Sequence, residues 1–121
     1  MKVFIVNLTS DENVSVRTFQ SPDMVSVKTR EFIQLGKNEI GIILGKKSNM
    51  LQGAFCQSGI VHPGFKGKLE PFFIVYGVGH GSWTIPVGAL VAHLLILNTE
   101  KEVDELDGIT KFIKNELVTI T

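Results

Sequence analysis

Apolar and polar residues alternate along several short segments of this chain, most regularly over residues 14–19. A period of two residues is typical of a β-strand that buries one face. Other segments rich in β-branched and aromatic residues are 3–8, 24–28, 32–35, 39–44, 69–76 and 89–97. The last two are the most apolar, so we predict that they are central strands. Short strands separated by turn residues predict an all-β sandwich or jelly roll.

The end of the chain follows a different pattern, because from Lys101 onward the apolar residues recur at helical spacing. These residues are Val103, Leu106, Ile109, Phe112, Ile113 and Leu117. Gly108 divides the stretch, so we predict a short C-terminal helical segment, either one interrupted helix or two short ones. It would seal the core or contact another subunit. The sequence contains no repeat, low-complexity tract or linker, which predicts a single domain over residues 1–121.

Composition limits the classes of partner. Twelve basic residues balance twelve acidic ones and give a formal net charge of zero, so nothing global indicates a nucleic-acid polymer or an anionic membrane. The apolar run 89–97 is interrupted by His93 and is too short to span a bilayer. The lone Cys56 cannot form an internal disulfide and is typical of a small buried apolar residue. No signal-peptide pattern opens the sequence, so we expect a cytoplasmic protein.

Three motifs carry the candidate chemistry. The first is Gly45-Lys46-Lys47-Ser48, the second is a predicted hairpin over residues 59–69, and the third spans residues 85–94. The second and third motifs contain several turn-forming or chemically functional residues, namely Gly59, His62, Pro63, Gly64, Phe65, Gly67, Gly88 and His93. Taken alone, a lysine pair is most often a solvated turn, and a histidine on an apolar strand can equally be a core residue.

In this order, over roughly residues 38–98, the three motifs resemble those of the trimeric dUTPase and dCTP deaminase superfamily. The resemblance implies a β jelly roll, a homotrimer and a nucleotide site at a subunit boundary. Lys46 and Ser48 match positions that bind phosphate, and Lys47 replaces a serine while keeping the site attractive to anions. By the same resemblance, Gly59, Gly64 and Phe65 belong to the turn that reads the pyrimidine and its sugar. His93 replaces a glutamine that contacts phosphate, and its ring can still donate a hydrogen bond.

Two further departures from the family fall on its catalytic acids. His62 stands where dUTPases carry the aspartate that positions water, and Phe72 stands where deaminases carry a glutamate. The sequence after residue 98 does not match the glycine-rich arm that closes over the triphosphate in dUTPases. No metal site is predicted, because the three histidines lack the paired spacing of zinc ligands. We expect no cofactor, and magnesium only if nucleotide hydrolysis is retained.

Three functions remain open. The first is a non-catalytic protein that binds or sequesters a nucleotide or related phosphorylated ligand through Lys46, Lys47, Ser48, Gly59, His62, Gly64, Phe65 and His93. The second is a trimeric scaffold for protein contacts, such as a viral accessory or particle protein in the host cytoplasm or the virion. The third is a divergent dUTP or dCTP pyrophosphatase in which His62 acts as the general base.

Overall fold

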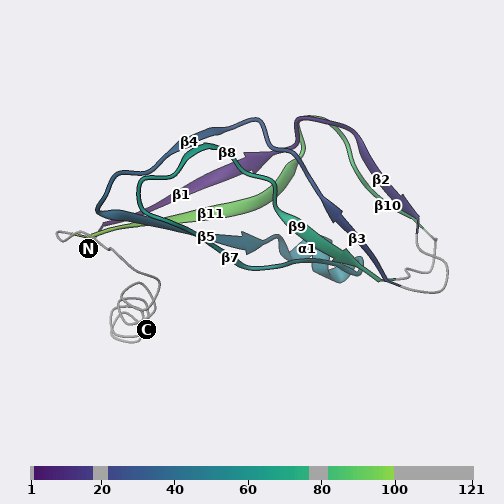
Figure 1. The fold of residues 1–121 in the computed structure, drawn as a ribbon. Helices are drawn as coiled ribbons and strands as arrows, with labels where there is room; N and C mark the ends of the chain where they lie inside the picture. Colours follow the sequence, from purple (N-terminus) through teal and green to yellow (C-terminus); the bar gives the residue numbers. More distant parts are fainter. Residues whose placement is uncertain (1, 18–21, 77–81, 100–121) are drawn as a thin grey trace.

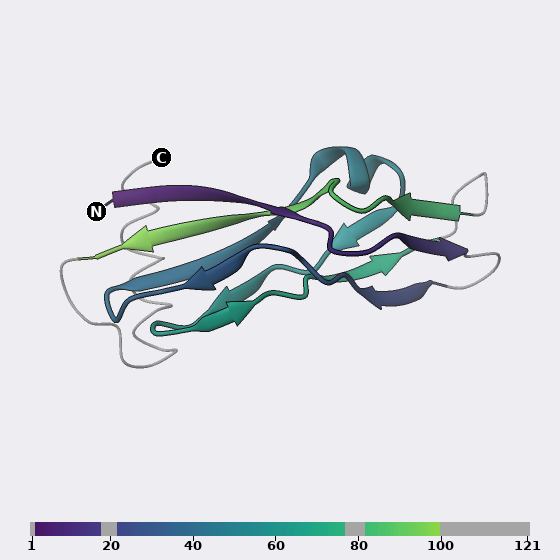
Figure 2. The same cartoon turned by 90° about the horizontal axis from the view of Figure 1, so that it is seen from above.

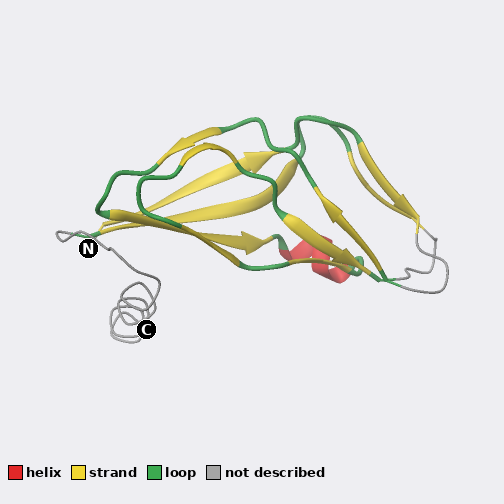
Figure 3. Ribbon diagram, viewed as in Figure 1, coloured by secondary structure: helices red, strands yellow, loops and turns green. Residues whose placement is uncertain are grey.

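The protein is represented by a computed structural model that describes residues 2–17, 22–76 and 82–99 (Figure 1). Its elements are β1 (Lys2–Thr9), β2 (Val14–Arg17), β3 (Asp23–Ser26), β4 (Phe32–Gln34), β5 (Glu39–Gly45), α1 (Lys47–Leu51), β6 (Ala54–Cys56), β7 (Gly59–Val61), β8 (Lys66–Lys68), β9 (Phe72–Val75), β10 (Ser82–Ile85) and β11 (Leu90–Asn98). Strands dominate and the one helix among the described residues is short (Figure 3). The all-β prediction is therefore confirmed. The predicted C-terminal helical segment and the glycine-rich loop 77–81 lie outside the described residues.

The strands form one sheet of four strands, one of three and two pairs. The four-stranded sheet has the order β1-β11-β5-β7, and the three-stranded sheet has the order β3-β9-β6. The pairs are β2 with β10 and β4 with β8, and every pairing is antiparallel. Seen from above, the longest strands run side by side along the length of the molecule (Figure 2). Because β9 and β11 both lie inside their sheets, the prediction of two central strands is confirmed.

The main core lies between these sheets. The four-stranded sheet contributes Leu8, Ile43 and Leu94, which belong to the same buried cluster as Phe73 on β9. Phe73 packs on Trp83 of β10 with ring centroids 5.0 Å apart and planes tilted by 43°. Fully burying one large apolar side chain stabilises a fold by about 1.5–3 kcal/mol. These contacts between sheets therefore hold the sandwich together.

Several boundaries and pairings differ from the sequence predictions. The strand predicted over residues 69–76 begins only at Phe72, because Leu69 and Pro71 instead accept backbone hydrogen bonds from the β3–β4 connection. Strand β10 was not among the predicted strands, and its Trp83 is 2% exposed. Helix α1 was not predicted. Its five residues are too few for a helical hydrophobic pattern to be recognised.

The predicted hairpin over residues 59–69 is also corrected. Strand β7 pairs with β5, whereas β8 pairs with β4, so the two strands do not pair with each other. The turn between them instead carries the chain from the four-stranded sheet to a neighbouring strand pair. Its Gly64 N–H donates to the Gly36 carbonyl at 3.2 Å, and the Leu35 N–H donates to the Phe65 carbonyl at 2.8 Å. The turn is therefore held by the β4–β5 connection beside it.

No helix in the described part of the chain is long and apolar enough to cross a membrane. The buried clusters are built instead from strands that pack face to face, and they draw on residues from both ends of the described chain. Strand β1 pairs with β11 over eight residue pairs, from Lys2 opposite Asn98 to Thr9 opposite Leu90. This pairing ties the first strand to the last one.

Gly41 marks the closest approach within the four-stranded sheet. A Cβ atom at this position would lie 2.9 Å from Leu94 Cδ1 and 3.1 Å from Val61 Cβ. Overpacking of this kind costs about 1–3 kcal/mol, so we expect Gly41→Ala to lower the free energy of unfolding by that amount in urea titrations. Gly59→Ala is the matched control, because its Cβ would be 3.8 Å from Ile43 Cδ1. Equal stability of the two variants would contradict this account.

The Glu31 side chain accepts two hydrogen bonds from Thr9, the last residue of β1. One carboxylate oxygen accepts a hydrogen bond from the Thr9 N–H at 2.7 Å and the other accepts one from the Thr9 hydroxyl. Partial burial raises the pKa of Glu31, but these bonds and the charge of Arg30 outweigh it, so the pKa is lowered overall. The carboxylate therefore stabilises the fold above the pKa it has in the unfolded chain, and this contribution is lost as pH falls through the folded-state value.

We therefore expect Glu31→Gln to be less stable than the parent protein at neutral pH. The difference should shrink as the solution is acidified below the ordinary range of a glutamate, because the parent carboxylate is then protonated too. Urea unfolding of both proteins across an acid pH series measures this difference. A difference that stays constant over the series would show that the hydrogen bonds to Thr9 do not depend on the charge of Glu31.

Candidate functional site

The first motif lies where β5 ends and α1 begins. Lys46 is the N-cap residue with φ −88° and ψ 130°, and its side chain makes no capping hydrogen bond. The N–H groups of Asn49 and Met50 donate to the Lys46 carbonyl at 3.1 and 3.3 Å. Lys47 and Ser48 open the helix and are exposed, while Lys46 is half-buried. The helix positions the three side chains of the motif without using them to close its own turn.

The third motif reaches the same end of the sheet through the pairing of β5 with β11. Gly45 is opposite Ala92, and Leu44 is opposite His93. The Asn49 side-chain amide also donates to the Val91 carbonyl at 3.5 Å, which connects α1 with β11. Four of the predicted site residues are thus brought to one end of the sheet. We call Lys46, Lys47, Ser48 and His93 the lysine cluster.

His93 is half-buried and is held by the first strand. Its Nδ1 atom lies 2.9 Å from Asn7 Oδ1, and the two residues are opposite each other in the β1–β11 pairing. When Nδ1 carries the proton and donates it to Asn7, a neutral ring has only Nε2 left, as an acceptor. Donation to an anion from the other side of the ring then requires the doubly protonated form. Asn7 therefore helps to decide what His93 can bind.

The second motif lies at the opposite end of the sheet. Gly59 is opposite Ile43, but Val61 is opposite Gly41, so β7 runs away from the lysine cluster. His62 follows as an exposed residue, and the Phe65 N–H donates to the His62 carbonyl at 3.1 Å. Gly64 has φ +79°, a left-handed conformation that favours glycine, which explains why the turn carries one here. We call His62, Gly64 and Phe65 the turn cluster.

The two clusters do not meet within one chain. Gly41 and Lys46 are five residues apart along the strand, a separation of about 17 Å, and His62 lies beyond the Gly41 end. Figure 1 shows the β7–β8 turn at the end of the sheet where β5 begins and α1 at the end where β5 finishes. A pocket that used both clusters would need two copies of the chain.

No carboxylate stands at the two positions where the resemblance places catalytic acids. His62 occupies one of them, and Phe72, which is 38% exposed on β9, occupies the other. Among the described residues, no group of three or more His, Cys, Asp and Glu side chains could hold a metal ion. Burial raises the pKa of the Cys56 thiol to about 11, so at neutral pH it is a thiol rather than a nucleophilic thiolate.

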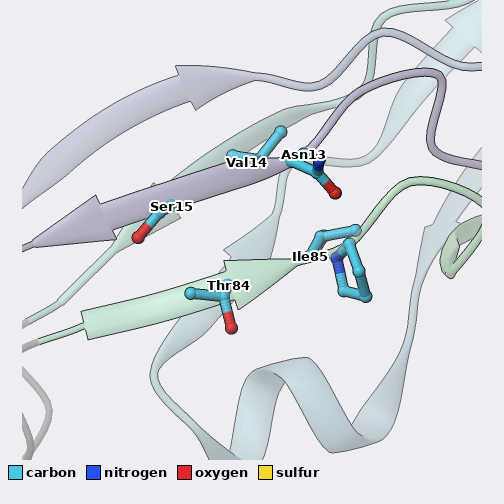
Figure 4. Close-up of a pocket in the computed structure, with 6 residues that line it drawn as sticks. Asn13, Val14, Ser15, Thr84 and Ile85 are labelled. Atoms are coloured by element: carbon cyan, nitrogen blue, oxygen red, sulfur yellow. The ribbon is translucent and has the colours of Figure 1, made fainter.

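A shallow pocket of about 290 Å³ lies elsewhere, between β2 and β10 (Figure 4). It is lined by Asn13, Val14, Ser15, Thr84, Ile85 and Pro86. None of these residues belongs to the lysine cluster or the turn cluster, and no charged side chain lines the pocket. Three of its lining residues are apolar, and its polar side-chain groups are two hydroxyls and the Asn13 amide. The Asn13 side chain already accepts the Val87 N–H at 2.8 Å.

Asn7 and Asn49 are the two site neighbours that the sequence did not reveal. Each is an isolated amide in its segment and belongs to none of the three motifs. Asn7 becomes relevant only through its register with His93, and Asn49 only through its bond to the Val91 carbonyl. Asn7 could have been found from the sequence only by predicting the register of the first and last strands. An antiparallel register that pairs Leu8 with Ala92 places Asn7 opposite His93.

The arrangement defines a class of protein: an all-β sandwich with two motif clusters at opposite ends of its main sheet. Comparison with solved structures shows that this fold is the dUTPase fold. The dUTPase of EIAV matches with TM-score 0.64 and 22% identity, covering 82% of this chain and 78% of that one. The dUTPase from phage phi11 of S. aureus matches with TM-score 0.68 and 13% identity, covering 85% and 82%.

The dUTPase of Staphylococcus bacteriophage 80alpha, solved with dUPNHPP, matches with TM-score 0.66 and 14% identity over 84% of this chain and 74% of that one. No protein-family model and no curated protein sequence matches the chain. At these identities the comparisons establish the fold but not the activity, which has to be argued from the site residues. The chain is thus a divergent protein with the dUTPase fold.

Proposed function

We propose that this chain is a non-catalytic protein of the dUTPase fold that binds a nucleotide or a related phosphorylated ligand. The observation that carries the proposal is the lysine cluster, because it gathers two ammonium groups, a hydroxyl and an imidazole at one end of the sheet. Such groups bind phosphate through charge and hydrogen bonds. The residues come from two motifs that are distant in sequence and that the β5–β11 register brings together.

The proposal that the protein is non-catalytic rests on His62 and Phe72. A general base in a hydrolytic site must hold and orient the attacking water, and an exposed histidine in a turn lacks the permanent charge of an aspartate. Removing one member of such a constellation commonly lowers the rate by orders of magnitude. His62 and Phe72 replace both acids that the resemblance implies. The protein would then sequester or sense its ligand.

The ligand site in this proposal lies between subunits of a homotrimer. The lysine cluster of one copy would meet the turn cluster of the next, since a single chain holds the two at opposite ends of the sheet. Closed cyclic symmetry gives three equivalent sites from this one contact. Gly59, which lies between the clusters on β7, would then line the passage from one to the other.

A depletion assay tests ligand binding. Excess protein is incubated with dUTP, dCTP, their monophosphates and several cyclic nucleotides, and the filtrate is profiled by ion exchange before and after heat denaturation. We expect one ligand to disappear and to return intact on heating. In Lys46→Ala/Lys47→Ala its affinity should fall at least about tenfold, because charge-assisted hydrogen bonds contribute about 1.5–3 kcal/mol each.

Lys2→Ala/Lys28→Ala is the matched control for this assay, since it removes the same charge from exposed positions outside both clusters. It should retain full binding. A new product peak would instead identify a divergent pyrophosphatase and direct attention to His62. An unchanged filtrate would refute ligand binding for the panel tested.

The shared site predicts a mass and a complementation pattern. Sedimentation equilibrium should give about 40 kDa, three times 13.3 kDa. Subunits of Lys46→Ala/Lys47→Ala keep an intact turn cluster, and subunits of His62→Ala keep an intact lysine cluster. When the two variants are mixed in equal amounts and assemble at random, about one quarter of the sites should combine the two intact clusters and bind the ligand. If the mixture binds no better than either variant alone, the clusters do not meet across a subunit boundary.

A second candidate function, a scaffold for protein contacts, is favoured by an exposed apolar patch on the three-stranded sheet. The patch contains Met24, Phe55, Phe72 and Tyr76, which are between 38% and 65% exposed. Phe55 and Tyr76 pack edge to face with centroids 5.5 Å apart. Exposed patches of this kind mark interaction sites. The 80alpha phage dUTPases are described as controlling transfer of virulence genes, so a viral accessory or particle protein is a coherent role for this fold.

A further inference from the structure

His93 has one hydrogen-bond partner, the side chain of Asn7. The Nδ1 atom of His93 lies 2.9 Å from Asn7 Oδ1. The two residues are opposite each other inside the β1–β11 pairing, with the pairs Val6–Leu94 and Leu8–Ala92 on either side. Because neighbours directly across an antiparallel pair share one face of the sheet, the register holds the two side chains within hydrogen-bond distance.

The atom that Asn7 presents decides where the imidazole of His93 carries its proton. An amide oxygen can only accept a hydrogen bond, so Nδ1 has to be the donor. A neutral imidazole carries a single N–H, which leaves Nε2 as an acceptor. In the part of the chain that the structure describes, His93 forms no other hydrogen bond or ion pair. Nε2 is therefore available to a ligand, but it can donate to an anion only from a doubly protonated ring.

The two strands that hold His93 bring no charge to it. Strand β11 has no charged residue, and the one charged residue of β1, Lys2, lies at its first position. The carboxylate at the other end of β1 belongs to Glu31, which is bound to the N–H and the hydroxyl of Thr9. Neither strand therefore supplies a negative charge that would favour a charged imidazole.

The charged groups on the other side of His93 are lysines. Lys46 follows β5, which pairs with β11 at His93, and Lys47 opens α1 directly after it. Ammonium groups carry the same sign as a doubly protonated imidazole and do not favour it. A bound phosphate would bring the negative charge that does favour the protonated ring. Protonation of His93 and binding of an anion should therefore occur together.

We propose that Asn7 is a positioning residue that makes ligand binding at the lysine cluster depend on proton uptake by His93. This inference rests on the proposed phosphate site. Asn7 holds the Nδ1 proton, so Nε2 donates to a phosphate oxygen only after His93 has taken a second proton from solution. The proton and the phosphate then strengthen each other's binding by the same factor.

The consequence is an affinity that falls as pH rises. Histidine side chains ordinarily change their charge between about pH 5 and pH 8. Where the ring of the free protein is neutral, uptake of one proton per ligand makes the dissociation constant rise about tenfold for each pH unit. Where the ring is already protonated, the dissociation constant no longer changes with pH.

The pH dependence of sulfate binding tests this coupling. Sulfate is the probe because it keeps two negative charges over the whole range, whereas a phosphate group changes its own charge near pH ~6. The dissociation constant is measured from backbone amide chemical shifts between about pH 5.5 and pH 8.5, a range that includes the titration of histidine. We expect the parent protein to bind sulfate at least about tenfold more weakly at the alkaline end.

Two histidine variants assign the pH dependence. In His93→Gln the side-chain amide donates a hydrogen bond at every pH, so the dissociation constant, whatever its value, should no longer vary. His62→Gln is the matched control, because it makes the same replacement at an exposed histidine of the turn cluster. It should keep the pH dependence of the parent. A pH dependence that survives in His93→Gln would overturn the inference.

The role of Asn7 is measured without any ligand, from the ¹⁵N chemical shifts of the His93 ring. At alkaline pH, where the ring is neutral, the parent should carry its proton on Nδ1. Asn7→Leu removes the acceptor at an exposed position, so the strand should tolerate it. In this variant the form protonated on Nε2 should appear, and sulfate binding should depend less on pH. A parent ring that already carries its proton on Nε2 would refute the role of Asn7.

The binding data also separate this inference from the proposed function. A parent protein that binds no sulfate at any pH refutes the phosphate site, and the proton uptake with it. A parent protein that binds sulfate with the same dissociation constant at every pH refutes the proton uptake alone.

Discussion

The antiparallel pairing of β5 with β11 is the constraint on which the rest of the molecule depends. It places Ile43 and Leu94 together on the inner face, where they join the core with Phe73 and Trp83. The same register sets His93 opposite Leu44 and so brings the third motif to the first. A shift by one residue would move every side chain of one strand to the other face. Core and candidate site are therefore fixed by a single register.

The periodic part of the fold could be predicted from the sequence. The apolar runs that contain β9 and β11 are long enough to be recognised as central strands. The alternation over residues 14–19 predicted the strand whose described part is β2. Short elements escaped because their signal is weak. Strand β10 is four residues long and begins directly after a glycine-rich stretch, so its Trp83 resembled a loop residue although it is packed against Phe73.

The sequence predicted which residues belong to the candidate site, but not how they are arranged. The motifs identified Lys46, Ser48 and His93 because their spacing resembled a known pattern. That the turn containing His62 lies at the far end of the sheet follows from the direction of β7 against β5, which the sequence does not reveal. Local chemistry is visible in residue types, whereas the distance between two motifs depends on strand pairing.

The residues of the two clusters differ in what the fold requires of them. Gly64 of the turn cluster has φ +79°, and Gly67 on the neighbouring β8 has φ +147°, so backbone conformation accounts for both glycines whether or not a ligand binds. Lys46 and Lys47 have no such structural role. Their side chains make no hydrogen bond or ion pair with any residue in the described part of the chain, and α1 has no acidic residue in its first turn for them to pair with. The proposed ligand site therefore depends on the lysines more than on the glycines.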